Sequence, residues 1–258
     1  MSMQFDERAS RRIEAIYLTP DVVQQRREVL AALALCPGER VVDLGSGPGL
    51  LAREMLEHLG SPGSVAGIDL SPDMVQLAQR RCTAHANAGF QAGDVTRLPF
   101  DDASFDVAVC TQVYEYVQDV DGALRELHRV LRPGGRAVVV DTDWASCVWN
   151  SSDAERMRRM LETWDLHCPH PRLPRTLRRR FVQAGLQVES TGSIVLLNER
   201  FDTDTYSHGM IGVIGAYAGQ RIGADVAAAW AEDLATLGAR DEYFFSLNRY
   251  MFRVRRPQ

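Results

Sequence analysis

The sequence predicts an α/β fold built around a doubly wound parallel sheet. Two observations lead to this class: short β-branched runs recur from residue 38 to residue 142, and segments with apolar residues at helical spacing separate them. Strands that alternate with helices of this length are typical of right-handed β-α-β crossovers. The length of 258 residues fits one such domain with an elaboration.

The first part of the chain carries the alternation. Five strands are expected, at residues 40–44, 64–70, 90–93, 105–111 and 136–141. Helices are expected at residues 5–35, 50–59, 71–86 and 121–131. Ser71-Pro72 suits a helix N-terminus, because Ser can cap the helix and Pro fits its first position. Pro133-Gly134-Gly135 is expected to end the last of these helices before the fifth strand.

The C-terminal part, residues 143–258, departs from this alternation. Helices are expected at residues 153–166 and 177–184, and strands at residues 187–197 and 243–254. Between these two strands lies a helical insertion, residues 203–238, with glycines at positions 209, 212, 215, 219 and 223. Open α/β sheets bind ligands at the carboxyl ends of their strands, so we expect the insertion to form a lid over a substrate. The single domain then consists of an N-terminal helical part (1–37), a ligand-binding core (38–142) and this C-terminal part.

Composition excludes several functions. The net charge of −5 lacks the basic footprint of a nucleic-acid-binding protein, so no nucleic-acid partner is expected. All 29 basic residues are arginine, which excludes Schiff-base and P-loop lysine chemistry. No apolar run reaches about 18 residues and the N-terminus is polar, so we expect neither a membrane span nor a secretory signal. The five cysteines form no C-x-x-C pair, which indicates free thiols in a cytoplasmic protein and no metal site.

A glycine-rich turn, Gly45-Ser46-Gly47-Pro48-Gly49, follows the first strand and precedes a helix. Glycines let the backbone approach a ligand closely, and the helix N-terminus offers unpaired N–H groups. The dinucleotide fingerprint would need a glycine at Leu50, and a pyrophosphate would be repelled by Asp43, the acid just before the turn. The spacing therefore disfavours a nicotinamide- or flavin-dependent oxidoreductase and favours a ligand with an ammonium group.

The segment from Val41 to Gly49 (VVDLGSGPG) resembles the first motif of class I S-adenosylmethionine-dependent methyltransferases, in particular the type 11 group with its quinone and natural-product methyltransferases. The chain follows the order of that family up to about residue 142. The resemblance implies a Rossmann-like sheet, mostly parallel with an antiparallel last strand, and N-terminal helices that cap the cofactor. It implies S-adenosyl-L-methionine as the cofactor, and methyl transfer by in-line displacement to an O, N or C atom of a small molecule.

By this resemblance, the residues that bind the cofactor lie at the ends of the first four strands. They are Asp43, Gly45, Ser46, Gly47, Gly49, Asp69, Leu70, Met74, Asp94, Val95 and Gln112. Asp43 would hold the methionine amino group, and Asp69 would accept both ribose hydroxyls. Each acid also has an alternative. Asp69 could serve only the following helix, whose dipole favours an acid, and Asp94 could cap a turn before Thr96 instead of accepting from the adenine.

The acceptor side is less defined. Methyl transfer needs a base only when the acceptor must lose a proton, so the sequence identifies no catalytic residue. Candidates for substrate contact follow the fourth and fifth strands or lie in loops and the N-terminal segment; ordinary packing is the alternative for each. They are Tyr17, Tyr114, Glu115, Tyr116, Trp144, His170 and His208. Residues 112–115 lack the Pro-Pro-aromatic motif of nucleobase amino methyltransferases, which disfavours that activity.

One alternative function stays open. A relative of the methyltransferase fold could bind the cofactor or a partner without turnover, although the glycine motif is intact. The identity of the acceptor, the pathway and the oligomeric state do not follow from the sequence.

Overall fold

The structure is a computed structural model that describes residues 14–258, and its described residues form one eight-stranded sheet. The strands lie in the order β3-β2-β1-β4-β5-β8; β7 and the two-residue β6 also pair with β8. Their bounds are β1 (Arg40–Leu44), β2 (Ser64–Asp69), β3 (Ala88–Ala92), β4 (Phe105–Thr111), β5 (Leu131–Thr142), β6 (Val148–Trp149), β7 (Gln187–Asn198) and β8 (Phe245–Arg255). Strands β1 to β5 pair in parallel, and β8 is antiparallel to β5, β6 and β7. The predicted fold class is therefore confirmed.

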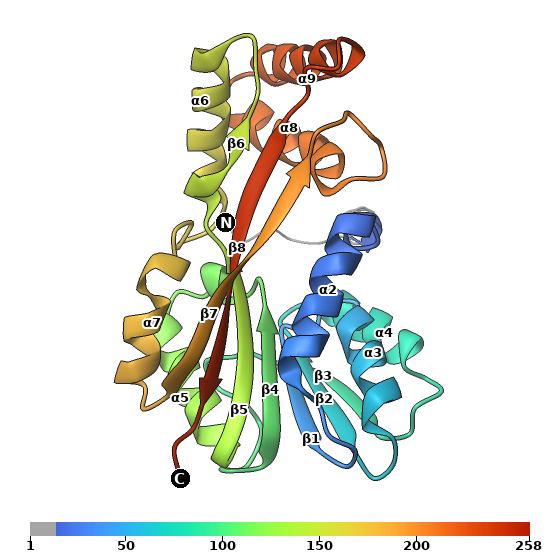
Figure 1. Ribbon diagram of the computed structural model, residues 1–258, viewed down its shortest axis with the longest axis vertical. Helices are drawn as coiled ribbons and strands as arrows, with labels where there is room; N and C mark the ends of the chain where they lie inside the picture. Colours follow the sequence, from blue (N-terminus) through green and yellow to red (C-terminus); the bar gives the residue numbers. More distant parts are fainter. Residues whose placement is uncertain (1–13) are drawn as a thin grey trace.

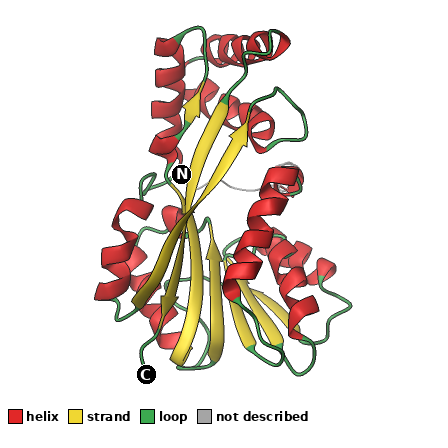
Figure 2. Cartoon of the chain, viewed as in Figure 1, coloured by secondary structure: helices red, strands yellow, loops and turns green. Residues whose placement is uncertain are grey.

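Helices cover both faces of the sheet and its upper end (Figures 1 and 2). One face carries α2 (Pro20–Leu33), α3 (Leu50–Leu59) and α4 (Pro72–Arg81), and the other carries α5 (Val120–Val130) and α7 (Pro174–Gln183). Three further helices gather beyond the carboxyl ends of the parallel strands: α6 (Ala154–Trp164), α8 (Tyr206–Ile222) and α9 (Ala224–Ala239). Short 3₁₀ turns are η1 (Tyr114–Tyr116), η2 (Trp144–Ser146) and η3 (Asp165–His167).

Neighbouring residues of each central strand pack into different cores. In β1, Val41 belongs to the cluster under α2, α3 and α4, whereas Val42 belongs to the cluster under α5 and α7. Burial on both faces explains why these strands read as continuous apolar runs. A third cluster joins α6, α8 and α9 to the upper ends of β7 and β8. The sheet thus supports a second packed unit above its carboxyl edge, as expected for a site at that edge.

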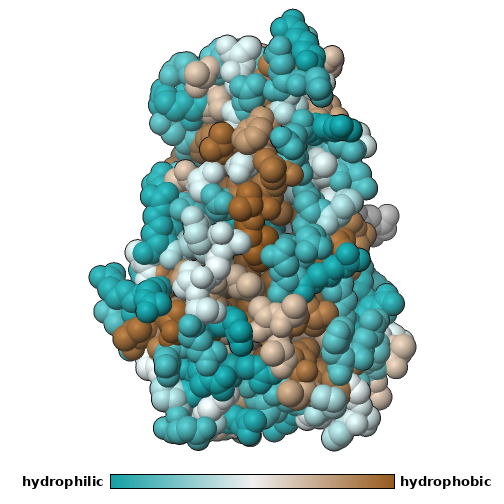
Figure 3. All heavy atoms as spheres, in the orientation of Figure 1, coloured by the Kyte–Doolittle hydropathy of each residue, from teal (hydrophilic) through white to brown (hydrophobic). Residues whose placement is uncertain are grey.

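Figure 3 shows apolar side chains along the middle of the face seen in Figure 1, over β7 and β8. In the upper half of β7, Ile194 and Leu196 are buried, while Val195 and Leu197 are about half exposed. The alternation shows that only one face of this part of the strand is covered by the described residues.

Several predicted boundaries are wrong for identifiable reasons. The helix expected over residues 5–35 breaks at Leu18, because Thr19 and Pro20 begin a new helix, α2; residues 5–13 lie outside the described part. The helix expected to reach residue 86 ends at Arg81, since residues 83–87 turn the chain into β3.

The Pro-Gly-Gly turn does not end the helix by itself. Helix α5 ends at Val130 and β5 begins at Leu131, opposite Phe105. The pairing then jumps to Val107 opposite Arg136, so Pro133 and its glycines form a bulge inside β5. Gly134 adopts φ +77°, which suits this bulge.

The insertion at residues 203–238 contains two helices, α8 and α9, that separate at Gly223, where φ is +110°. The other glycines do not interrupt the helices. Instead, Gly209 lies so close to Ile16 that an added Cβ would be 2.5 Å from its side chain, and Gly219 packs against α9. The glycine spacing therefore serves close packing against neighbouring segments.

Candidate functional site

A cavity of about 1080 Å³ lies at the carboxyl edge of the sheet, and we call it the central cavity. The loops after β1, β2, β3 and β4 form one part of its wall, with α2 and α4 beside them. Residues from η2, α6, η3 and α8 form the other part, together with Tyr116 of η1. Strands β1 and β4 are neighbours whose crossovers lead in opposite directions along the sheet, so the cavity lies at the topological switch point.

The glycine loop after β1 takes its shape from β2. The N–H groups of Gly45 and Ser46 both donate to the carbonyl oxygen of Ile68, at 2.7 and 2.9 Å. Gly45, Gly47 and Gly49 all have positive φ, which L side chains rarely adopt. A Cβ on Gly45 would meet Val113 at 2.2 Å and one on Gly49 would meet Ala78 at 2.8 Å, but one on Gly47 would meet nothing within 4 Å. Gly45 and Gly47 both line the cavity, and Gly47 is the one at which an added side chain would meet no protein atom.

Asp69 links the glycine loop to the next helix. Its Oδ2 accepts the N–H of Gly47 at 2.8 Å, and its Oδ1 accepts the N–H of Ser71 at 2.9 Å. Burial raises the pKa of Asp69, while these two backbone donors lower it. Asp69 therefore accepts a hydrogen bond at the start of the following helix, as the alternative interpretation expected. It also lines the central cavity, where it can contact a ligand.

Asp43 lies behind the glycine loop, only 2% exposed, and is not among the residues that line the cavity. Its Oδ2 has no hydrogen-bond partner among the described residues. Burial, together with the nearby charge of Asp69, raises the pKa of Asp43 to about 7. The buried Asp43 and the partly exposed Asp69 together form a region that favours a positively charged group.

The remaining predicted cofactor residues fall into two groups. Six line the central cavity: Ser46, Leu70, Met74, Asp94, Val95 and Gln112. Gly49 lies at the N-cap of α3 and outside the lining. Leu70 is 73% exposed, an unusual position for a large apolar side chain. Asp94 accepts from both the N–H and the hydroxyl of Thr96 at 2.8 Å, so the turn-capping alternative is also correct.

Gln112, just after β4, has a left-handed backbone with φ +58°. Its N–H donates to the carbonyl of Val140 at 2.6 Å, and its Oε1 lies 3.5 Å from Nε2 of Gln25. The Oε1 of Gln25 in turn accepts from the guanidinium of Arg249, which is fully buried under the ring of Tyr206. A strained residue at a strand end is a common feature of ligand-binding sites.

The wall opposite the glycine loop is aromatic. His167 stacks on Trp164 with ring centroids 3.8 Å apart and an angle of 9°, and Trp144 meets both rings edge-on. The Nε2 of His167 lies 3.3 Å from the hydroxyl of Tyr116. All four side chains line the central cavity.

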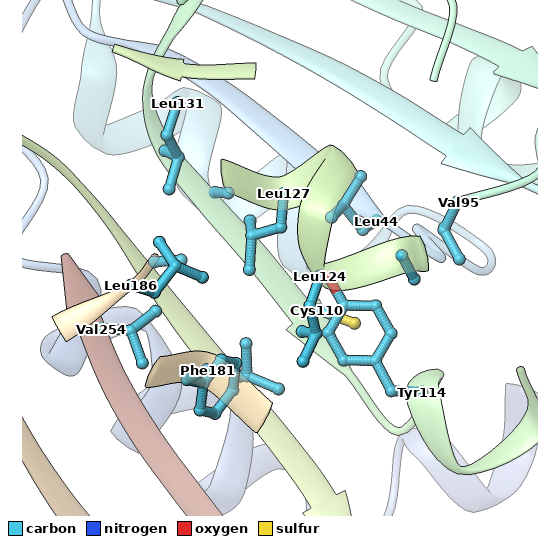
Figure 4. Close-up of a cluster of buried hydrophobic side chains, with 14 of the residues drawn as sticks. Leu44, Val95, Cys110, Tyr114, Leu124, Leu127, Leu131, Phe181, Leu186 and Val254 are labelled. Carbon is cyan, nitrogen blue, oxygen red and sulfur yellow. The ribbon is translucent and has the colours of Figure 1, made fainter. Parts of the chain in front are cut away.

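Of the acceptor-side candidates, the structure brings Tyr17, Tyr116 and Trp144 to the cavity. Tyr114 instead points into the core beside Cys110 and Leu124, as Figure 4 shows. His170 and His208 do not line the cavity; His208 packs edge-on against Phe201.

Glu115 is fully buried behind the aromatic wall. Its Oε2 accepts the N–H of Thr142 at 2.8 Å, and its N–H donates to Asp141 at 3.3 Å. Burial raises the pKa of Glu115 to about 7, although the positive charge of Arg249 opposes the shift. Glu115 therefore belongs to a buried charge cluster beneath the site.

Sequence reasoning missed His167. It lies in the run Asp165-Leu166-His167-Cys168, which has no periodicity, and its neighbours come from α6 and η1. The closest signal was the polar, aromatic segment after β4 that contains Tyr116.

Two further findings concern the described residues. Among residues 14–258, no set of three or more His, Cys, Asp or Glu side chains is arranged to hold a metal ion. No helix in that part of the chain has the length and apolar character needed to cross a membrane.

Comparisons with known proteins agree with this geometry. Residues 42–139 match the family Methyltransf_11, described as a methyltransferase domain. The chain is 41% identical over 108 residues to a 2-phytyl-1,4-naphtoquinone methyltransferase of Synechococcus elongatus, which covers 41% of this chain and 46% of that protein. The chain spans less than half the length of the curated relatives it matches first.

Two solved structures share the fold. A phosphoethanolamine N-methyltransferase 2 of Haemonchus contortus in complex with S-adenosyl-L-methionine has a TM-score of 0.66 and 17% identity, covering 99% of this chain and 58% of that one. The [4+2]-cyclase SpnF has a TM-score of 0.60 and 21% identity, covering 92% of this chain and 81% of that one. The matched domain, the sheet order and the glycine loop agree. Residues 42–139 therefore match a methyltransferase-domain family, and the chain shares the fold of these two solved structures.

Proposed function

We propose that the chain binds S-adenosyl-L-methionine against the glycine loop and transfers its methyl group to a small molecule held by the aromatic wall. The observation that carries this proposal is that a single cavity joins the two regions. Ligand pockets usually enclose about 300–1,000 Å³. At about 1080 Å³, the central cavity is large enough for a cofactor and an acceptor side by side.

The electrostatics of the glycine-loop side suit a cationic cofactor. The carboxyl groups of Asp43 and Asp69 lie close enough for the charge of Asp69 to raise the pKa of Asp43. A ligand with an ammonium and a sulfonium group would relieve this repulsion. The Oδ2 of Asp43 has no hydrogen-bond partner behind the loop, so the charge of Asp43 would act on such a ligand without direct contact.

The hydrogen-bonding capacity also fits. Each carboxylate oxygen of Asp69 accepts one backbone N–H and keeps a lone pair, so it can accept a ribose hydroxyl as well. Asp94 can likewise accept from an adenine amino group, because Thr96 donates only to its Oδ1 and leaves Oδ2 free to accept. Exposed Leu70 and the cavity-lining Met74 offer apolar surface for the purine.

The cofactor supplies an activated methyl group. The residues of this chain would therefore act by alignment and by exclusion of water more than by covalent chemistry. The glycine loop fixes one end of the cofactor, and the aromatic wall limits the positions that an acceptor can take.

We also propose that the N-terminal part, as far as it is described, and the insertion at residues 203–238 enclose the acceptor. Asp21 at the start of α2 supports this, because its Oδ2 accepts the N–H of Tyr206 at 2.9 Å and the side-chain amide of Asn198 at 3.0 Å. Gly209 packs on Ile16 in the same region. Tyr206 and Met210 of α8 line the cavity.

Turnover tests this proposal. The full chain is incubated with methyl-labelled S-adenosylmethionine and a panel of small phenols, quinols and amines, and label in the products is counted. We expect transfer to at least one class, and its loss in Asp69→Ala. Cofactor binding without transfer to any acceptor favours the non-catalytic alternative. Conversion of an acceptor without methylation favours an activity like that of the [4+2]-cyclase SpnF, which shares the fold.

A cytoplasmic location belongs to the same proposal. All five cysteines are free, which suits a reducing compartment. Cell fractionation with an antibody to the chain checks this.

A further inference from the structure

The side chains of the aromatic wall indicate which kind of acceptor the central cavity fits, provided that the proposed function holds. The charged side chains among the described lining residues are Arg26, Asp69, Asp73 and Asp94. All of them lie on α2, on α4, at the end of β2 or in the loop after β3. Arg26 is already paired with Glu54 at 2.7 Å. The part of the wall from η2, α6, η3 and α8 therefore offers no counter-ion.

An acceptor with a carboxylate, phosphate or ammonium group would lose its hydration at this wall without gaining a partner. Such desolvation is costly for any ion. Neither Arg249 nor Glu115 changes this, because neither lines the cavity. Arg249 lies behind Tyr206 and bonds to Gln25, and Glu115 is fully buried behind the wall. The wall thus selects for an uncharged acceptor.

The ring geometry favours a planar aromatic molecule. Trp164 and His167 stack in parallel, while Trp144 stands edge-on to both at 5.5 and 4.9 Å. Aromatic partners gain energy from stacked and from edge-on contacts beyond their buried area, so the parts of these rings that line the cavity favour an aromatic acceptor. Tyr206 and Met210 add further apolar surface.

Tyr116 and His167 form a polar pair in this wall, and the proton of the His167 ring can be assigned. The Nδ1 of His167 lies 2.5 Å from the carbonyl oxygen of Trp164, which can only accept, so Nδ1 carries the proton. In the neutral ring Nε2 is then a bare acceptor that can take the proton of the Tyr116 hydroxyl, 3.3 Å away; the buried carboxyl group of Glu115 lies near the same hydroxyl. Burial lowers the pKa of His167 to about 4, which keeps the ring neutral at pH 7. The oxygen of Tyr116 is left with lone pairs for a donor in the cavity.

We infer that the acceptor is an uncharged aromatic molecule whose hydroxyl group donates a hydrogen bond to Tyr116, and that Tyr116 and His167 take up the hydroxyl proton during methyl transfer.

The step balances. The acceptor oxygen forms a bond to the methyl carbon, the carbon–sulfur bond breaks, and its electron pair stays on sulfur, which leaves neutral S-adenosylhomocysteine. The acceptor proton moves to the oxygen of Tyr116 as the proton of Tyr116 moves to Nε2 of His167. The imidazolium then donates to Trp164 and Tyr116, and later releases its proton to water.

Binding of matched probes tests the inference without an identified substrate. The full chain is saturated with S-adenosylhomocysteine, and 2-naphthol, naphthalene, 2-naphthoate and 2-naphthylmethylamine are titrated by calorimetry. We expect 2-naphthol to bind about fivefold more tightly than naphthalene, the value of one hydrogen bond. Both charged probes should bind more weakly than naphthalene.

Single substitutions show which side chains cause the preference for 2-naphthol. Tyr116→Phe should abolish the preference for 2-naphthol over naphthalene, and His167→Phe, which keeps the stacked ring, should reduce it. Tyr217→Phe is the matched control, because Tyr217 packs edge-on against Trp164 but does not line the cavity. It should leave the preference unchanged. Thermal unfolding confirms that each variant is folded.

Three results would overturn the inference: tighter binding of either charged probe than of 2-naphthol, no detectable binding of 2-naphthol, or an unchanged preference in Tyr116→Phe. The titration with S-adenosylhomocysteine shows whether the inference about the acceptor fails or the proposed function itself fails. If S-adenosylhomocysteine itself does not bind, the proposed function fails first.

Discussion

The carboxylate of Asp69 accepts the backbone N–H of Gly47 at 2.8 Å, so the acid after β2 and the glycine loop after β1 form one unit. A ligand that contacts either residue therefore depends on both. The unit spans two neighbouring parallel strands, and the pairing of Leu44 with Ile68 places their ends side by side.

Replacing Asp69 with Ala should remove two charge-assisted hydrogen bonds to the ribose, each worth about 1.5–3 kcal/mol. We expect the affinity for S-adenosylhomocysteine, measured by calorimetry, to fall at least about tenfold. Asp153→Ala is the matched control, because Asp153 also accepts a helix N-terminal N–H, that of Arg156, at 2.9 Å, but lies outside the cavity lining. Equal affinity in wild type and Asp69→Ala would show that Asp69 serves only the loop and the helix.

Gly45→Ala and Gly47→Ala should differ in how far they affect stability and cofactor binding. Both positions have positive φ, which costs a non-glycine residue about 1–2 kcal/mol. At Gly45 the methyl group would also collide with Val113, so we expect a larger loss of unfolding free energy there.

At Gly47 the methyl group meets no protein atom, so the variant should fold and instead lose cofactor affinity. Urea unfolding and calorimetry measure the two effects. A stable Gly47→Ala variant with normal affinity for S-adenosylhomocysteine would place the cofactor elsewhere.

Asp43 should make the ligand-free protein less stable as pH rises. Its pKa is about 7 in the folded chain against 3.8 without the fold. Between these values the unfolded chain loses the proton while the folded chain keeps it, so the free energy of unfolding falls as pH increases from 3.8 to about 7.

Asp43→Asn removes this contribution. At pH 8 the ligand-free variant should be more stable than wild type by about 1 kcal/mol or more, with little difference at pH 4. Its affinity for S-adenosylhomocysteine should nevertheless fall, since the ammonium group loses a nearby charge. Parallel pH dependences of wild type and variant in urea unfolding would contradict the assignment.

The segments joined by Asp21 should become protected together when ligand binds. Hydrogen exchange with and without S-adenosylhomocysteine should show slower exchange in residues 14–30 and 203–238. In Asp21→Ala, which loses the contacts to Tyr206 and Asn198, both segments should exchange faster. Exchange that is already slow in the free protein and unchanged by ligand would show that the insertion is a rigid cap.

Much of the cofactor side could be predicted because its signals are local. The strands β1 and β4 begin and end at the predicted residues, since short β-branched runs bounded by glycine or polar residues specify buried parallel strands. Ser71 caps α4 as predicted, with its hydroxyl accepting the N–H of Met74.

Only part of the acceptor side could be predicted: Tyr17, Tyr116 and Trp144 line the cavity as candidates, but the rest depends on contacts between distant segments. His167 reaches Tyr116 only when η3 packs over η1, and no spacing in the sequence records that approach. The spacing of the insertion glycines does not show what they pack against: Gly209 lies against Ile16, a residue nearly 200 positions earlier. The β5 bulge likewise follows from pairing with β4 and not from Pro133 alone.

Calorimetric titration of the full chain with S-adenosylhomocysteine, and separately with NAD, tests the central claim most directly. The account predicts saturable binding of S-adenosylhomocysteine at one site per chain, with no measurable heat from NAD, because Leu50 replaces the glycine that a dinucleotide turn needs. Saturable binding of NAD without binding of S-adenosylhomocysteine would contradict it.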